Sequence, residues 1–436
     1  MDRSLWAVLA GTFSLRFSTG LTGAMLGVYL ANLPEHGGPR VDPLIVGMFS
    51  ATFYLAELVL SPIFGILSDR QGHHRVMLYG PVFGAVAVIL TGLTTNLLIL
   101  GGTRWLEGAS TAASVPSILG YIAMVTAGNE NLRGQASARF EGATLLGLGA
   151  GFAVAPLLFA ALGPIAFYLN AVLYGVSFLI FWTVRDPSAE REMRGQLHVG
   201  FGRYLGLLRS SHVWLLAPTW IAVNASIGLW FSQSIFQFAK PNPKFPEQTL
   251  MRGFSAVQIS GTAVVIGIIF GLGLLYWGNR FKNTRRTTII LYGILGGAAL
   301  VAAGLAINHA EGAPLAIPLV AVGFAALGLF VLAGATPAAL GLLADISERF
   351  PADRGAIMGL YSVFLAIGQI AGSLIGGLAA EARGIDGMLI ATVGLLAVAL
   401  VPLAFLRRDE DQLGLPVGDL GAEPVEPAEA VGGGMR

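Results

Sequence analysis

Four charged residues lie deep inside long apolar stretches of the sequence, where an ionised side chain needs a specific reason to be present. They are Arg16, Glu57, Arg104 and Glu107. A charge near the centre of a lipid bilayer costs about 2.5–3.5 kcal/mol on insertion scales, so each should face a partner or a water-filled cavity. Arg16 lies about 16 Å into the stretch 5–32, at 1.5 Å per helical residue. We expect Arg16 to contact a ligand or an anion, the alternative being a structural anchor to backbone carbonyls or an acid.

The two carboxylates have the properties of proton carriers. Removal from water favours the neutral form of an acid, and Glu57 lies in mid-stretch on an i, i+4 stripe with Ser61 and Gly65. Arg104 and Glu107 are three residues apart on one helical face and can pair. Protonation of Glu107 would then free Arg104 for another partner. Static roles remain open: a structural hydrogen bond for Glu57, and a permanent buried ion pair for the other two.

A second group combines aromatic rings with uncharged polar side chains. It consists of Trp220, Asn224, Trp230, Gln233 and Gln237 in residues 213–239, and of Thr336 beside Pro337 in residues 313–344. Such side chains offer flat apolar faces and a few hydrogen bonds but no acid. That suits lipophilic or amphiphilic ligands better than sugars, which need many hydrogen-bond partners. Packing inside a helix bundle is the alternative for each aromatic residue.

The composition indicates the solvent in which these residues work. The 436 residues are 55% hydrophobic and 12% charged, with a mean hydropathy of +0.71, whereas soluble domains carry about 25% charged residues. Runs of about 20 apolar residues, enough to cross a hydrocarbon core of about 30 Å, recur along the chain. A net charge of +1 argues against a nucleic-acid partner, and the lack of Cys excludes disulfides, thiol catalysis and Cys metal sites. We therefore predict an all-α integral membrane protein.

Twelve apolar stretches, separated by charged or Pro/Gly-rich breaks, predict twelve transmembrane helices. They cover residues 5–32, 44–67, 76–95, 97–126, 137–162, 164–184, 213–239, 255–279, 286–307, 313–344, 354–380 and 385–406. A polar break after the sixth stretch divides the chain into six-helix bundles at 1–184 and 213–407. Between them, residues 185–212 are expected to form a cytoplasmic middle loop with an amphipathic helix at 201–209, and residues 408–436 a disordered cytoplasmic tail.

Basic residues are distributed unequally between the two sets of connections. With both termini and the middle loop on one side, eighteen Lys and Arg collect there against five on the other side, or thirteen against five without the middle loop. By the positive-inside rule, both termini are predicted to be cytoplasmic. The excess of Arg (23) over Lys (3) is consistent with a GC-rich bacterial genome, so we expect a multi-pass protein of the bacterial inner membrane.

The two bundles show weak internal repetition at an offset of 221 residues. Arg133-Gly134 returns as Arg354-Gly355, and the helices that follow match at Phe140 and Tyr361, Gly147 and Gly368, and Gly151 and Gly372. Alternating access by two rocking bundles requires duplicated halves of this kind. The repetition therefore predicts two pseudo-symmetric bundles.

The connection after the second stretch carries a recognisable motif. Residues 65–75 read Gly-Ile-Leu-Ser-Asp-Arg-Gln-Gly-His-His-Arg and resemble the loop motif of the major facilitator superfamily at Gly65, Leu67, Asp69, Arg70 and Gly72. Two His stand where the family usually has bases, and Arg75 follows one place later. In the family this loop is a latch between the halves in the outward-open state, which here implies charge-assisted hydrogen bonds of Asp69, Arg70 and Arg75. The second half has Asn279 where Asp would stand, so a second latch is not expected.

Two further motifs lie inside predicted helices. Arg104-Trp105-Leu106-Glu107-Gly108 resembles the superfamily's Arg-x-x-x-Gly motif, whose buried Arg is linked to proton coupling. Gly142, Gly151 and Pro156 match the antiporter motif Gly-(x8)-Gly-(x3)-Gly-Pro, with Ala155 in place of its last Gly. The resemblance covers all twelve stretches and implies the major facilitator fold, most similar to twelve-span drug:proton antiporters. In that fold stretches 1, 4, 7 and 10 line the cavity, which implies substrate contact for Arg16 and for the aromatic and polar group.

These observations predict a secondary active transporter that exports small hydrophobic or amphiphilic compounds by proton-coupled alternating access. Alternatives are a lipid or lysolipid transporter of the same fold, an uptake symporter or uniporter of an organic anion that Arg16 would bind, and a scaffold that does not transport. An enzyme is not expected, because the sequence shows no paired catalytic acids at fixed spacing, no Ser/His/Asp grouping and no Walker-type loop. We expect no cofactor and no metal. The expected partners are a lipophilic substrate, protons and the bilayer, with the chain a monomer.

Overall fold

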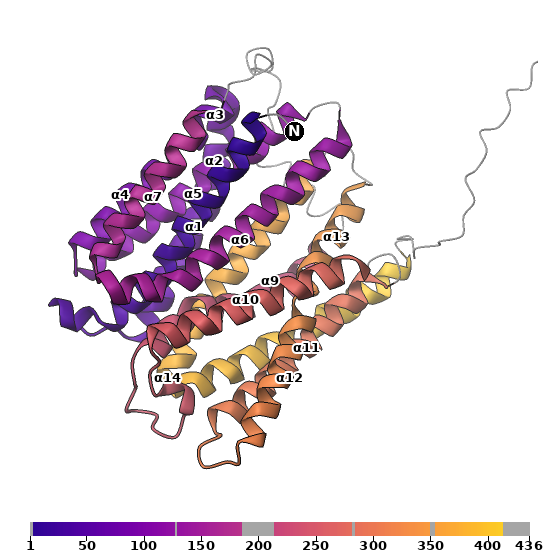
Figure 1. Cartoon of the computed structure of the whole chain (residues 1–436). Coiled ribbons are helices and arrows are strands. Elements are labelled where there is room, and N and C mark those ends of the chain that lie inside the picture. The colour runs from indigo at the N-terminus through magenta and orange to yellow at the C-terminus, as the bar shows by residue number, and fades with distance from the viewer. Residues whose placement is uncertain (1–2, 127–128, 185–212, 281–283, 349–353, 413–436) are drawn as a thin grey trace, which may run out of the picture.

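The computed structural model describes residues 3–126, 129–184, 213–280, 284–348 and 354–412, and these form helices joined by short connections (Figure 1). Large apolar side chains are exposed on the helix surfaces, including Leu98, Leu275 and Leu315, which are 88%, 70% and 73% exposed. A helix satisfies its own backbone N–H and C=O groups, and lipid is as apolar as the exposed side chains. Helices with apolar surfaces are therefore stable within a bilayer. The all-α prediction is confirmed.

The described residues of the first half form seven helices, drawn in indigo to magenta in Figure 1. They are α1 (Arg3–Ala31), α2 (Pro43–Gln71), the short α3 (His73–Met77), α4 (Tyr79–Leu93), α5 (Leu97–Val125), α6 (Glu130–Leu162) and α7 (Ile165–Trp182), with the 3-10 turn η1 (Leu33–His36) between the first two. Helix α1 packs along α6 and α7, α2 packs along α5, and α4 packs against α5 and α7.

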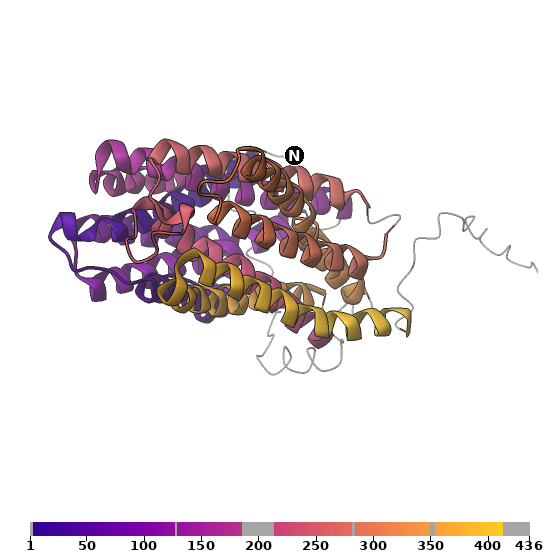
Figure 2. The same ribbon diagram turned by 90° about the horizontal axis from the view of Figure 1, so that it is seen from below.

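The described residues of the second half begin at Val213 and are drawn in red to yellow. They contain α9 (Val213–Ala239), the 3-10 turn η3 (Thr249–Met251), α10 (Ala256–Gly278), α11 (Arg286–Asn308), α12 (Ala316–Leu332), α13 (Ala335–Glu348) and α14 (Arg354–Gln412). Helix α9 packs along α14, and α11 packs against α12, α13 and α14. Seen from below in Figure 2, the long helices of both halves run lengthwise in broadly the same direction. The predicted amphipathic helix at 201–209 lies outside the described residues.

Helix α14 includes the last two predicted membrane stretches, with a break between them. The backbone leaves the helical region at Arg383 (φ −142°, ψ 20°) and at Gly384 (φ 59°, ψ −139°). Gln248, in the connection between α9 and α10, bonds to both sides of this break: its Nε2 donates to the carbonyl of Arg383 at 2.9 Å, and its Oε1 accepts from the N–H of Ile385 at 2.9 Å. The positive φ explains why Gly occupies position 384.

Other boundaries also differ from the sequence-based expectation. The tenth predicted stretch, 313–344, forms two helices, α12 and α13, which part at Gly334, where an added Cβ would lie 2.7 Å from the ring of Trp277. At the other end of the chain, α14 continues to Gln412, past the expected start of the tail at 408. Arg, Glu and Gln are good helix formers in water, so the last turns persist beyond the apolar stretch. The remainder of the predicted tail lies outside the described residues.

Nine helices of the described residues are long and apolar enough to cross a membrane. Helices α1 and α9, with 29 and 27 residues, are not among the nine. The two parts of α14 count as one span. The chain is therefore a multi-pass helical membrane protein, while the total of twelve stays a prediction.

The two halves make contact near one end of their helices, which we call the joined end. There Lys240 pairs with Glu35, and Gln233 donates from Nε2 to the carbonyl of Pro43 at 2.9 Å. Further along, the rings of Phe152 in α6 and Phe231 in α9 lie 5.7 Å apart in a T-shaped contact. Helix α2 also packs against α14, and α6 against α10.

Candidate functional site

Arg104 and Glu107 form a buried ion pair within α5. The Nη1 atom of Arg104 donates to Oε2 of Glu107, and the two residues are 7% and 1% exposed. The guanidinium also lies 4.8 Å from the ring centroid of Phe53 in α2, a cation–π contact. Among the described residues, Nε of Arg104 and Oε1 of Glu107 have no hydrogen-bond partner. The pair therefore keeps unused donor and acceptor capacity at a depth where unpaired polar atoms are costly.

Glu57 and Arg16 lie beside this pair on neighbouring helices. Gly108 allows α5 to touch α2, because a Cβ there would lie 3.2 Å from the backbone N of Glu57 and 2.6 Å from Cβ of Ala56. Arg16 reaches across from α1, with Nη1 3.5 Å from the hydroxyl of Thr111 in α5. The positive charge of Arg16 interacts electrostatically with the carboxyl group of Glu57. The structure thus gathers all four charged residues singled out in the sequence inside the first half, on α1, α2 and α5.

Two residues of this cluster were not predicted from the sequence. Tyr54 of α2 is half-buried, and its hydroxyl interacts electrostatically with Glu57, Arg104 and Arg16. Glu141 of α6 interacts electrostatically with Arg16. The signal for Tyr54 was available, since it lies three residues before Glu57 on the same helical face. The signal for Glu141 was not, because only the packing of α6 on α1 brings it near Arg16.

His73 and His74, in the loop motif at residues 65–75, contact other residues of the first half. Gly72 has φ 101°, a conformation that favours Gly, and it ends α2 before α3 begins. His73 lies 3.2 Å from the hydroxyl of Ser68 and 4.0 Å from the carboxylate of Asp69, and His74 lies 3.1 Å from the carbonyl of Phe181 in α7. Asp69, Arg70 and Arg75 are exposed. A Cβ on Gly65 would meet only Pro116, at 3.9 Å, so this Gly does not mark a close helix contact here. The predicted latch stays a prediction.

The antiporter motif in α6 has one glycine that packs and one that does not. A Cβ on Gly151 would clash with the carbonyl of Phe17 in α1, whereas nothing lies within 4 Å of a Cβ on Gly142. Pro156 lies inside α6 and is buried. In the second half, Gly372 of α14 is held in the same way against the backbone of Ala225 in α9. Positions 221 residues apart therefore serve equivalent helix contacts in the two halves.

The aromatic and polar group of the second half is packed rather than open. Trp220, Asn224 and Gln233 are 2%, 3% and 0% exposed. Asn224 donates to the carbonyl of Trp220 at 2.9 Å, and the indole N–H of Trp230 donates to the hydroxyl of Thr392 at 3.0 Å. Thr336, in the first turn of α13, is half-buried. Substrate contact by these side chains stays a prediction, because in this conformation protein atoms cover most of them.

The described residues contain no group of three or more His, Asp or Glu placed to hold a metal ion. The polar chemistry of the site is thus carried by the ion pair, the two further carboxylates and Arg16. In membrane proteins, charged side chains inside the helix bundle commonly mark pathways for substrates, ions or protons.

Comparison with known proteins gives the family. The model of the Major Facilitator Superfamily matches residues 8–310 and 253–428, and the chain belongs to this superfamily. It is 24% identical over 391 residues to the quinolone resistance protein NorA of Staphylococcus aureus, covering 86% of this chain and 90% of that protein. It is 27% identical over 353 residues to multidrug resistance protein 1 of Bacillus subtilis, covering 76% and 80%.

Solved structures agree on the fold. The nucleoside transporter NupG matches with a TM-score of 0.68 at 15% identity, covering 93% of this chain and 99% of that one. A variant of the peptide transporter POT in complex with alafosfalin matches with a TM-score of 0.70 at 16% identity, covering 94% and 95%. The family prediction is confirmed, as is the helical membrane fold of the superfamily, whereas the twelve-helix count and the division into two six-helix bundles stay predictions. The chain is a bacterial multi-pass membrane transporter.

Proposed function

We propose that this chain exports small hydrophobic or amphiphilic compounds in exchange for protons, by alternating access of a central site to the two sides of the membrane. The observation that carries the proposal is the buried Arg104–Glu107 pair, which lies beside Glu57 and Arg16. Helices α5 and α2, which carry Glu107 and Glu57, pack closely at Gly108. The class of cargo is supported by the two bacterial relatives, whose names describe quinolone and multidrug resistance.

The proposed coupling step is a proton transfer to Glu107. With Glu107 ionised, the charge of Arg104 is compensated. When a proton binds a carboxylate oxygen of Glu107, the buried guanidinium loses its counter-charge, and an uncompensated buried charge costs about 3–5 kcal/mol. A conformation in which Arg104 meets another acceptor then becomes favourable, and Glu57 on the adjoining helix is the acceptor we propose. Proton binding and conformation are linked in this way.

The joined end is proposed to be the periplasmic gate. If both termini are cytoplasmic, as the distribution of Lys and Arg predicts, Glu35 and Lys240 lie on the outer side and the present conformation is closed outward. Asp69, Arg70 and Arg75 then lie on the inner side, where they are available to latch the halves when the outer gate opens. Release of Gln233 from Pro43 would accompany that opening and uncover Gln233 for cargo.

Liposomes that contain a pH-sensitive dye test the proposal. Lipophilic cations, neutral drugs, carboxylates and lysolipids are added in turn to vesicles with the wild type, Glu107→Gln or Glu57→Gln. The matched control is Glu247→Gln, which makes the same change at an exposed connection. We expect one class of lipophilic compound to drive proton movement in the wild type and the control, and Glu107→Gln to abolish it while binding persists.

Two results would argue for other functions. Movement of lysolipid alone would favour a lipid transporter of the same fold, and movement of carboxylates alone would favour anion transport through Arg16. Cargo movement without proton movement in every protein would exclude coupling.

A further inference from the structure

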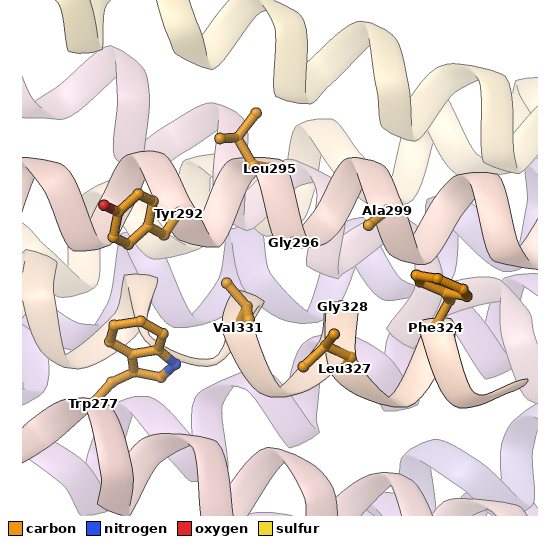
Figure 3. A pocket seen from close by; sticks show the side chains of 9 residues that line it. All are labelled: Trp277, Tyr292, Leu295, Gly296, Ala299, Phe324, Leu327, Gly328 and Val331. Atoms are coloured by element: carbon orange, nitrogen blue, oxygen red, sulfur yellow. The ribbon is translucent and has the colours of Figure 1, made fainter. Parts of the chain in front are cut away.

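An apolar groove runs between α11 and α12 on the surface of the second half (Figure 3). Two adjoining hollows of about 320 and 530 Å³ form it, and Ala299 and Phe324 border both. Leu295, Phe324 and Leu327 are 52%, 59% and 58% exposed along its walls. The side chains named in Figure 3 are almost wholly hydrocarbon or aromatic, so an apolar occupant fits and water does not.

One end of the groove carries aromatic rings and positive charge. Trp277 of α10 and Tyr292 of α11 border this end, with ring centroids 6.2 Å apart. Tyr276 packs against Trp277, and Arg280 stacks 5.0 Å from the ring centroid of Tyr276 and donates to its hydroxyl at 3.0 Å. A guanidinium has five N–H donors, so this one bond leaves capacity for an anion. Arg285, exposed at the start of α11, adds positive charge at the same end.

The opposite end has a different character. It is lined by small and aliphatic residues, Ala306, Ala316 and Ile317, and the nearby connection carries the acid Glu311, which pairs with Arg252. From Tyr292 to Ala306 the groove extends about 21 Å at 1.5 Å per residue, longer than a single leaflet of about 15 Å. A long apolar slot with aromatic rings and excess positive charge at one end, and a charge-balanced ion pair near the other, is complementary to a molecule with one anionic head and a long hydrocarbon chain.

We propose that this groove binds an anionic phospholipid, with one acyl chain between α11 and α12 and the phosphate at Arg280. The bilayer is the source, because the groove opens along an exposed apolar surface and a lipid reaches it without leaving the membrane. Tryptophan and tyrosine favour the headgroup region, which places Trp277 and Tyr292 at the chain–headgroup boundary. The site is separate from the charged cluster of the first half and holds a resident lipid rather than cargo.

Tryptophan quenching by lipids with brominated acyl chains tests this site. The protein is reconstituted in phosphatidylcholine vesicles with increasing mole fractions of brominated phosphatidylglycerol or brominated phosphatidylcholine. Trp277 is one of seven Trp, so its signal is the difference between the wild type and Trp277→Phe. We expect half-maximal quenching of Trp277 at an about fivefold lower mole fraction of phosphatidylglycerol, the preference that one basic residue confers near an anionic lipid.

Two variants separate the headgroup contact from the chain contact. Arg280→Gln should remove the preference for phosphatidylglycerol, whereas Arg40→Gln, an exposed cation far from the groove in sequence, should keep it. Ala299→Phe fills the groove and should reduce quenching of Trp277 by both lipids, whereas Ala161→Phe on the exposed surface of α6 should not. Equal quenching by both lipids in the wild type would overturn the proposal. So would full relief of quenching by a lipophilic drug, which would make the groove a cargo site, or by raised protein density, which would make it a contact between two copies.

Discussion

The guanidinium of Arg104 is held between two helices: it pairs with Glu107 on its own helix and lies 4.8 Å from the ring of Phe53 on α2. One positive charge thereby links the helix that carries Glu107 to the helix that carries Glu57. Any change in the protonation of Glu107 therefore acts on the packing of α2 against α5.

The first prediction concerns the stability of this pair. Arg104→Met or Glu107→Met alone leaves the other charge buried, and we expect each to lower the free energy of unfolding by about 3–5 kcal/mol. The double substitution removes both charges and should cost much less than the sum. SDS-induced unfolding of the three variants in micelles measures the difference. Additive losses would mean that the two residues do not interact.

The second prediction separates the two motif glycines of α6. Gly151→Ala places a Cβ against the carbonyl of Phe17, and overpacking of this kind costs about 1–3 kcal/mol. Gly142→Ala is the matched control, because its Cβ meets nothing within 4 Å and Ala favours a helix by about 1 kcal/mol. Thermal unfolding in detergent should show a lower Tm for Gly151→Ala only. A larger loss for Gly142→Ala would contradict the packing of α6 on α1.

The third prediction is a pH dependence of the joined end. The hydrogen bond and positive charge of Lys240 lower the pKa of Glu35. Above the usual carboxyl pKa of about 4.3 the pair is fully ionised and favours contact between the halves. This contribution is lost as the pH falls through the lowered pKa of Glu35, so acid on this side should separate the joined end.

Spectroscopic labels measure that separation. The native chain has no Cys, so a thiol-reactive label attaches only at Arg40→Cys in the first half and Glu247→Cys in the second. We expect the distance distribution to shift to longer values in acid and, at neutral pH, in Lys240→Gln. Glu35→Lys combined with Lys240→Glu should restore the short distances. An unchanged distribution in Lys240→Gln would show that the pair does not hold the halves together.

The fourth prediction concerns the break in α14. Gln248→Leu removes both hydrogen bonds that bracket Arg383 and Gly384. It leaves the buried N–H of Ile385 and the partly buried carbonyl of Arg383 unsatisfied, at about 1–3 kcal/mol each. We expect faster hydrogen exchange of the amides around Ile385, measured by mass spectrometry. Exchange equal to that of the wild type would mean that the break is set by Gly384 alone.

Part of this organisation was predictable because it depends on local spacing. A spacing of three residues places Arg104 and Glu107 on the same face of a helix, where they can pair. The loop motif likewise predicts a turn at Gly72, which has a positive φ. The charged residues in apolar stretches were also predictable as a buried group, because lipid cannot accommodate them singly.

Other features depend on how helices pack, which spacing does not encode. The approach of Arg16 to Thr111 joins positions 95 residues apart, and the contact of Gln233 with Pro43 joins positions 190 apart. The division of the tenth stretch into α12 and α13 coincides with the ring of Trp277 against Gly334, a contact between separate helices. The burial of Trp220 and Gln233 likewise reflects one conformation of two halves that a single sequence does not specify.

The most direct test of the exchange of cargo for protons uses inside-out membrane vesicles with an imposed pH gradient, acid inside, and a fluorescent lipophilic cation outside. The account predicts accumulation of the cation in the wild type and in Glu247→Gln. It also predicts collapse when an ionophore dissipates the pH gradient, and absence of accumulation in Glu107→Gln. Accumulation that persists without the gradient, or that Glu107→Gln leaves intact, would contradict it.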